Sequence, residues 1–222
     1  MFKDKIKNKS LLKLKINKKK LNILLIGKYI KKKTGKISIY NFLKKNHTIT
    51  FCEEFEDIKI KKYDYIISYG YGKILNKSQI DKLNGTIINL HMGYLPFARG
   101  IYPLVWSLIF TKPVGFTIHL ISDNKIDVGP ILYRKKVDYK ETDNLKQIHF
   151  NCKREIEKYF ISNIDKILSY KKKLNKPRSF KRYYFSRKCS NKLLYELPNK
   201  WNTKANYIKI NSKILKKIYQ SN

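Results

Sequence analysis

Short apolar runs separated by helical segments restrict the fold of this chain more than any other feature. Runs rich in Ile, Leu, Val, Thr and Tyr predict strands at residues 21–26, 48–52, 63–69, 86–91, 114–121 and 130–137. Apolar residues at helical spacing predict helices at residues 37–45, 78–83, 104–110 and 142–168. Strands that alternate with helices form a largely parallel sheet with helices on both faces. The sequence therefore predicts an α/β fold.

The run at residues 86–91 ends in two polar side chains, Asn89 and His91. Residues two apart on a strand point to the same face, and open α/β sheets bind ligands beyond the carboxyl ends of their strands. Asp127 follows a later predicted strand. An amide that holds an oxyanion, an imidazole that handles protons and a carboxylate that sets its charge can together transfer an acyl group to an amine. These three residues are therefore candidate catalytic groups.

Two of the three, Asn89 and His91, also have an ordinary structural explanation when each is taken alone. Asn89 is a common turn residue, and His91 is compatible with a core histidine whose nitrogens are hydrogen-bonded within the fold. The combination favours a functional role, because a Leu-Pro loop follows the pair and Asp127 stands in an Asp-Val-Gly-Pro segment.

Three motifs in this order resemble the formyltransferase family that uses 10-formyltetrahydrofolate. They are NLHMGYLPFARG at residues 89–100, VGFTIHLI at 114–121 and IDVGPIL at 126–132. The family includes glycinamide ribonucleotide, methionyl-tRNA and sugar N-formyltransferases. The resemblance covers roughly residues 63–140. It implies a Rossmann-like formyltransferase fold with a mostly parallel central sheet, and 10-formyltetrahydrofolate as the formyl donor.

The resemblance also implies a role for each candidate catalytic residue. Asn89 would donate its amide N–H to the tetrahedral oxyanion. A protonated His91 would stabilise the same oxyanion and pass a proton to the leaving N10 nitrogen of the folate. Asp127 would raise the pKa of the imidazole and position a water that relays the amine proton. His119 resembles the family's second histidine, which supports the aspartate loop, although a structural core histidine is the alternative.

Two further segments match the part of the family that binds the folate. They contribute the candidate cofactor-binding residues Gly72, Lys73, Ile74 and Leu75, and then Gly93, Tyr94, Leu95 and Pro96. In the first segment, backbone groups would hydrogen-bond the pterin and the apolar side chains would form its wall. In the second, Gly93 and Tyr94 depart from the common Ser-Leu-Leu-Pro loop, which weighs against methionyl-tRNA as the acceptor. The loop at 122–127 would close the other edge of the pterin. No metal site is expected.

The acceptor is expected to be a small amine, most consistent with an anionic, nucleotide-linked amino sugar. Arg99 is a candidate for binding a substrate anion, although a structural salt bridge is the more common fate of a loop arginine. Trp106 stands in Pro-x-x-Trp-Ser, as in sugar N-formyltransferases, although its physical chemistry favours a core tryptophan.

Three alternatives stay open at this stage. Within the same class, the acceptor is methionyl-tRNA or glycinamide ribonucleotide. A hydrolase would instead release formate without any amine. A third alternative is a non-catalytic basic module that binds nucleic acid, because the formal net charge is +34. That charge is nearly all Lys in a chain also rich in Ile, Asn and Tyr, so compositional bias is preferred to a dedicated nucleic-acid surface.

The remaining features bear on compartment and domain organisation. Cys52, Cys152 and Cys189 have no metal-ligand spacing and suggest reduced thiols in the cytoplasm. The apolar run at 21–26 is too short to span a membrane, and no export signal is visible. The expected organisation is a basic arm at 1–20, a catalytic domain at 21–170 and a basic extension at 171–222. The extension is either a small packed subdomain or a solvated tail with anchoring aromatics. A homodimer is compatible with the sequence.

Overall fold

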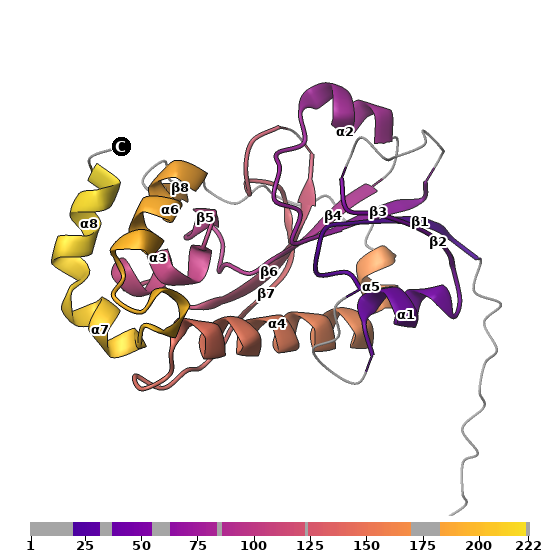
Figure 1. Cartoon of the computed structure of the whole chain (residues 1–222). Helices are drawn as coiled ribbons and strands as arrows, with labels where there is room; N and C mark the ends of the chain where they lie inside the picture. Colours follow the sequence, from indigo (N-terminus) through magenta and orange to yellow (C-terminus); the bar gives the residue numbers. More distant parts are fainter. Residues whose placement is uncertain are drawn as a thin grey trace, which may run out of the picture.

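The computed structural model describes residues 20–31, 37–54, 63–83, 86–122, 124–169 and 183–220. Its central sheet has six strands in the order β2-β1-β3-β4-β6-β7 (Figure 1). The strands are β1 (Asn22–Ile26), β2 (Thr48–Cys52), β3 (Tyr65–Tyr69), β4 (Thr86–His91), β6 (Gly115–Ile121) and β7 (Ile131–Lys136). The four strands β2, β1, β3 and β4 pair in parallel, whereas β6 and β7 join antiparallel. The predicted α/β fold with a mostly parallel sheet is confirmed.

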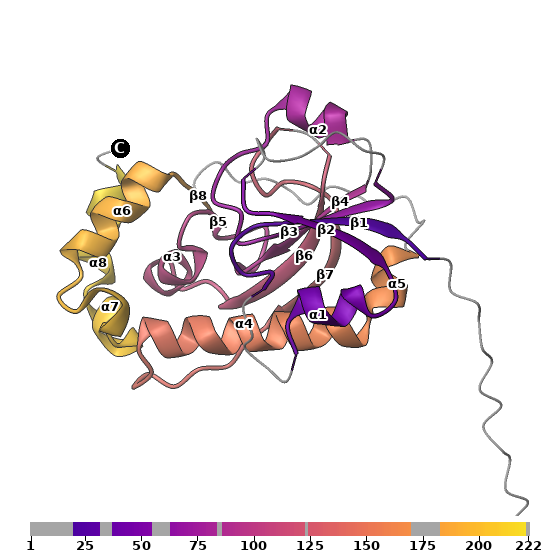
Figure 2. The ribbon, with the colours of Figure 1, turned by 45° about the vertical axis from the view of Figure 1, so that its right-hand side comes forward.

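Helices cover both faces of this sheet. On one face lie α1 (Ile39–Lys44), α4 (Leu145–Ser162) and α5 (Ile164–Leu168), and on the other lies α2 (Lys77–Leu83) (Figures 1 and 2). Alternate residues of β1 divide between the two faces. Ile23 and Leu25 pack into the core under α4, and Leu24 and Ile26 pack toward α2. Burial on both faces explains why the parallel strands read as continuous apolar runs.

Several predicted helix boundaries are wrong, and side-chain caps explain two of the starting positions. The helix predicted at 142–168 begins at Leu145, because Asn144 and Gln147 form a reciprocal capping box, and it is interrupted at Asn163. The short helix for which Ser78 is the expected cap begins at Lys77, because Asn76 provides the cap and its side chain accepts a hydrogen bond from the Gln79 amide.

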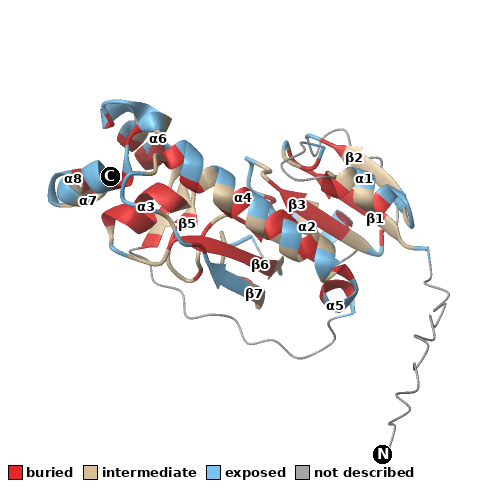
Figure 3. Ribbon diagram, turned by 90° about the horizontal axis from the view of Figure 1, so that it is seen from below, coloured by how far each residue is buried: buried red, intermediate tan, exposed pale blue. Residues whose placement is uncertain are grey.

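Residues 183–220, here called the C-terminal module, pack against the core. The module contains β8 (Tyr184–Phe185), α6 (Arg187–Glu196), the 3₁₀ helix η3 (Lys200–Asn202), α7 (Ala205–Ile210) and α8 (Ser212–Gln220). Its helices α7 and α8 pack against α3 (Pro103–Ile109), and β8 pairs in parallel with β5 (Arg99–Gly100). Its exposed residues face outward (Figure 3). The described part of the extension is therefore packed, whereas 1–19 and 170–182 lie outside the described residues.

Within the described ranges, none of the helices combines the length and the apolar character that a bilayer-spanning segment needs.

Candidate active site

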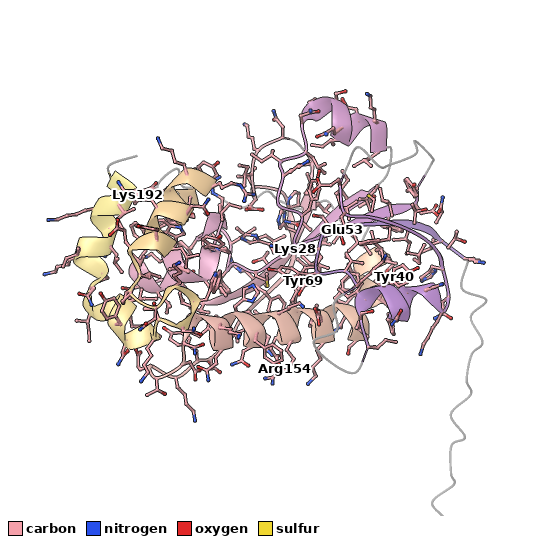
Figure 4. The ribbon with its side chains drawn as sticks, viewed as in Figure 1. Lys28, Tyr40, Glu53, Tyr69, Arg154 and Lys192 are labelled. Atoms are coloured by element: carbon pink, nitrogen blue, oxygen red, sulfur yellow. The ribbon has the colours of Figure 1, made fainter. Side chains whose placement is uncertain are left out.

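A cavity of about 350 Å³ lies beyond the carboxyl ends of β1, β3 and β4. This is where the open α/β arrangement places ligand sites. The segments that line it are Lys28–Tyr29, 70–75, 89–92, 100–104, Ile121 with 124–127, His149, and four residues of the C-terminal module, Tyr184, Phe185, Arg187 and Trp201. Lys28 and Tyr69 lie in the central part of the molecule, whereas Lys192 points outward from α6 (Figure 4). The cavity is thus shared between the sheet and the C-terminal module.

Asn89 lines the cavity and is held from the neighbouring strand. It stands opposite His119 in the β4–β6 pairing, and the two side chains meet at 3.1 Å between Asn89 Nδ2 and His119 Nε2. His119 Nδ1 lies 2.9 Å from the carbonyl oxygen of Leu120, which can only accept, so Nδ1 donates and Nε2 accepts from Asn89. One amide hydrogen of Asn89 is thereby fixed, and the other is left for a ligand.

Asp127 approaches both histidines from the loop before β7. Its backbone is left-handed, with φ of 51°, a conformation that Asp tolerates better than most residues. Its Oδ2 accepts a 2.8 Å hydrogen bond from the Gly100 amide and lies 3.7 Å from His91 Nδ1, and its Oδ1 lies 3.4 Å from His119 Nε2. Burial alone would raise the pKa of this carboxyl, but the positive charge that His91 carries in acid and the hydrogen bond from the Gly100 amide hold it well below its usual range. Asp127 is therefore a carboxylate at neutral pH.

His91 is buried and is oriented by the loop that follows β4. Its Nε2 lies 3.0 Å from the carbonyl oxygen of Ala98, so Nε2 carries a hydrogen and Nδ1 is turned to Asp127. Burial lowers the pKa of His91 below 6.5, and Asp127 opposes this change without overcoming it. The expectation that Asp127 raises this pKa is confirmed for its own contribution, but burial outweighs it. At neutral pH His91 is uncharged, with an acceptor nitrogen at the site.

Sequence reasoning missed four half-buried rings that line the cavity, here called the aromatic wall: Tyr29, Tyr102, His149 and Trp201. They pack edge to face in series, with ring centroids 5.9 Å apart for Tyr29–His149, 5.4 Å for His149–Trp201 and 5.3 Å for Tyr102–Trp201. Burial, followed by Lys153 and Lys28, lowers the pKa of His149 to about 4. His149 is therefore uncharged at neutral pH. The members of the wall come from four separate segments, and no local motif marks them.

The candidate cofactor-binding residues divide into two groups. Gly72, Lys73, Ile74 and Leu75 line the cavity, and Ile74 is 60% exposed there. Gly93, Tyr94, Leu95 and Pro96 are not among the residues that line it.

The residues of the second group instead contact side chains of β6 and β7. Thr117 Oγ1 accepts from the Leu95 amide at 3.0 Å and donates to the Gly93 carbonyl at 2.7 Å. The guanidinium of Arg134 donates to the Leu95 carbonyl and lies over the ring of Tyr94. Gly93 is also sterically required, because a Cβ there would lie 2.4 Å from His91 Nε2.

The two acceptor candidates do not line the cavity either. Arg99 is 7% exposed and lies beside the carbonyl of Ile126 and the charge of Asp127. Trp106 is fully buried and donates its indole N–H to Ser190 Oγ at 2.9 Å. Both side chains make their contacts inside the protein, as the structural alternative for each residue expects. Among the described residues, no group of three His, Cys, Asp or Glu side chains is arranged to hold a metal ion.

Comparison with known proteins gives one consistent result. A family model described as formyl transferase matches residues 30–164. The methionyl-tRNA formyltransferase of Bacillus subtilis (strain 168) is 33% identical over 102 residues, which are 46% of this chain and 32% of that protein. The dTDP-4-amino-4,6-dideoxyglucose formyltransferase of Mycobacterium bovis is 32% identical over 85 residues, 38% of this chain and 35% of that protein. The chain thus spans about a third of the length of these curated relatives.

Solved structures match over more of the chain. The formyltransferase PseJ from Anoxybacillus kamchatkensis, in complex with UDP-4,6-dideoxy-4-formamido-L-AltNAc and tetrahydrofolate, is 28% identical, with a TM-score of 0.70 over 84% of this chain and 97% of that one. The sugar 3N-formyl transferase WlaRD, at 21% identity and a TM-score of 0.62 over 89% of this chain and 80% of that one, shares the fold. The match to PseJ covers most of both chains.

Proposed function

Because the chain belongs to the formyl transferase family, we propose that it transfers a formyl group from 10-formyltetrahydrofolate to a primary amine on a nucleotide-linked amino sugar. The observation that carries the proposal is the meeting of an amide, an uncharged imidazole and a carboxylate at one cavity. The similarity to PseJ supports the substrate class, because that enzyme was solved with a formamido sugar nucleotide and tetrahydrofolate. We also propose that the reaction takes place in the cytoplasm.

The residues around the cavity fit a folate on one side. Ile74 is an exposed apolar side chain beside the backbone of Gly72 and Lys73, and the segment 124–127 faces the same space. An apolar wall with convergent backbone groups suits a planar pterin. When bound, the folate supplies the activated formyl group. Residues 72–75 and 124–127 would hold it.

The chemistry then follows from the state of each side chain. The second amide hydrogen of Asn89 donates to the oxygen on which negative charge develops. The unprotonated Nδ1 of His91 accepts the proton that the attacking amine loses, and it returns that proton to the leaving nitrogen. Asp127, 3.7 Å away, stabilises the imidazolium that exists between these two transfers. His91 is thus proposed as a proton acceptor in the resting site.

The acceptor occupies the side that the folate leaves open, along the aromatic wall. Aromatic rings suit the apolar C–H face of a deoxy sugar, and a small cavity of about 350 Å³ has room for the reacting ends of two substrates rather than for their full lengths. Lys28 is an exposed cation at the same cavity and suits the phosphates of a nucleotide. The net charge would steer an anionic acceptor toward the protein.

The proposal is tested by incubating the protein with 10-formyltetrahydrofolate and a panel of nucleotide-linked 3- and 4-amino sugars. Glycinamide ribonucleotide and charged initiator tRNA serve as alternative acceptors. Tetrahydrofolate release and the mass of the formylated product are both measured. We expect tetrahydrofolate release that depends on an amino sugar and a matching formamido product. Formate release without an amine would identify a hydrolase, and formylation restricted to tRNA would overturn the sugar assignment.

A further inference from the structure

Trp106 joins a hydrogen-bond relay that begins in α3 and crosses into the C-terminal module. Its Nε1 donates to Ser190 Oγ at 2.9 Å, and the Ser190 hydroxyl donates to the Ile101 carbonyl at 2.9 Å. Both side chains are fully buried. Buried hydrogen bonds hold their geometry strongly, because breaking one leaves a polar group without a partner and away from water.

The relay continues through the backbone of Gly100 and Ile101. The Ile101 amide donates to the Phe185 carbonyl at 3.0 Å, so both polar groups of Ile101 are tied to the C-terminal module. Gly100 has a φ of 94°, and a Cβ there would lie 2.2 Å from the Phe185 oxygen. The Gly100 amide, on the other side of this fixed backbone, donates to Asp127 Oδ2. The direction of that amide is therefore set by β8 and α6.

The ring of Trp106 fixes the same turn by packing. It stacks on Phe185 with centroids 4.4 Å apart and ring planes 5° from parallel. Trp106 thus contacts the module at Phe185 before α6 and at Ser190 within it. Asp127, by contrast, stands in a left-handed backbone conformation, which persists when its surroundings impose it.

We propose that Trp106 and Ser190 are positioning residues, which act through Ile101 and Gly100 to hold the Asp127 carboxylate beside His91. The inference rests on the proposed role of Asp127 in formyl transfer. It gives the buried tryptophan a part in the reaction without any contact with a substrate.

The chain offers a matched control for this relay. Ser107 follows Trp106 in α3, is 1% exposed, and has a buried hydroxyl with no hydrogen-bond partner among the described residues. Removing the hydroxyl of Ser107 or of Ser190 deletes the same atom from a buried helical serine. Only the second deletion interrupts the relay.

The test uses the ¹⁵N-labelled full chain and follows the Gly100 amide, which needs no activity to be read. The variants are Ser190→Ala, Trp106→Phe and Ser107→Ala. Asp127→Asn serves as a reference, because it shows where the Gly100 amide resonance lies when its acceptor carries no charge. We expect Ser190→Ala and Trp106→Phe to move the Gly100 proton resonance in the same direction as Asp127→Asn. We also expect Gly100 to exchange about tenfold faster relative to the Leu24 amide in β1, and Ser107→Ala to leave both readouts unchanged.

Activity supplies the second measurement. We expect kcat to fall several-fold in Ser190→Ala and Trp106→Phe, with both KM values within about twofold of the parent, as for a group acting only in the transition state. An unmoved Gly100 resonance in both variants would overturn the relay, as would an equal displacement in Ser107→Ala. If the parent protein formylates no amine while Gly100 responds as expected, the relay stands and the proposed function fails.

Discussion

Replacing Asp127 by Asn tests how the site sets the charge of His91. The side chains keep nearly the same shape, but the negative charge 3.7 Å from His91 Nδ1 is lost. At an effective dielectric constant of about 20, two unit charges at that distance interact by about 4 kcal/mol, which corresponds to about three pKa units. The range seen for such pairs is about one to three units.

The expected direction follows from which form the carboxylate favours. Asp127 stabilises the imidazolium, so its removal lowers the pKa of His91, which burial already holds below 6.5. The variant should therefore carry a neutral His91 down to a pH about one to three units lower than the parent does. Because the proposed acceptor form is the neutral one, the acidic limb of the rate profile should move to lower pH, while kcat falls about a hundredfold as the imidazolium loses its partner.

The direct assay is a nuclear magnetic resonance titration of the His91 ring in the parent and in Asp127→Asn. Asp81→Asn is a matched control, because Asp81 is an exposed carboxylate paired with Lys77 on α2. The reasoning would be refuted by a His91 pKa that is the same in Asp127→Asn as in the parent. A decrease of the same size in Asp81→Asn would mean that net charge, not the local pair, controls the histidine.

Three further predictions concern other parts of the molecule. His149→Phe keeps the ring contacts but removes an imidazole whose pKa falls from 6.5 to about 4 on folding. As the pH falls from 6.5 to 4, the parent should therefore lose about 3 kcal/mol of unfolding free energy relative to the variant, as measured by urea titration. Trp201→Ala should raise the KM for the acceptor about tenfold and leave the KM for the folate within about twofold. Equal increases in both KM values would contradict the assignment of the aromatic wall to the acceptor. Removing residues 1–20, which contain nine Lys and one Asp, should reduce kcat/KM modestly and mainly at low ionic strength, whereas a steep salt dependence that collapses on truncation would favour an RNA acceptor.

The parts of the fold that could be predicted are those governed by local pattern. The strands at 48–52 and 86–91 match at both ends, because apolar β-branched runs in a buried sheet leave few alternatives. The same pattern predicted that Asn89 and His91 would share a site, and both line the cavity. Helix ends were less predictable, since Asn144 acts as a cap only when Gln147 can reach its backbone.

The parts that could not be predicted depend on contacts between distant segments. Trp106 meets Ser190 across 84 positions, and the aromatic wall joins residues from Tyr29 to Trp201. The net pKa of His91 was also out of reach, because a nearby carboxylate is visible in a motif whereas the degree of burial is not. Packing decided each of these features, and a single sequence gives little information on packing.

The position of the C-terminal module along the chain has a consequence for biosynthesis. Asn89, His91 and Asp127 leave the ribosome before Tyr184, Phe185, Arg187 and Trp201, which complete the cavity and tie down Gly100. A growing chain therefore holds all three polar groups while one side of their pocket is missing. A chain that stops before residue 183 would lack the residues of the module that line the cavity beside Asn89, His91 and Asp127. The order of synthesis thus delays a complete cavity until the C-terminal module has folded.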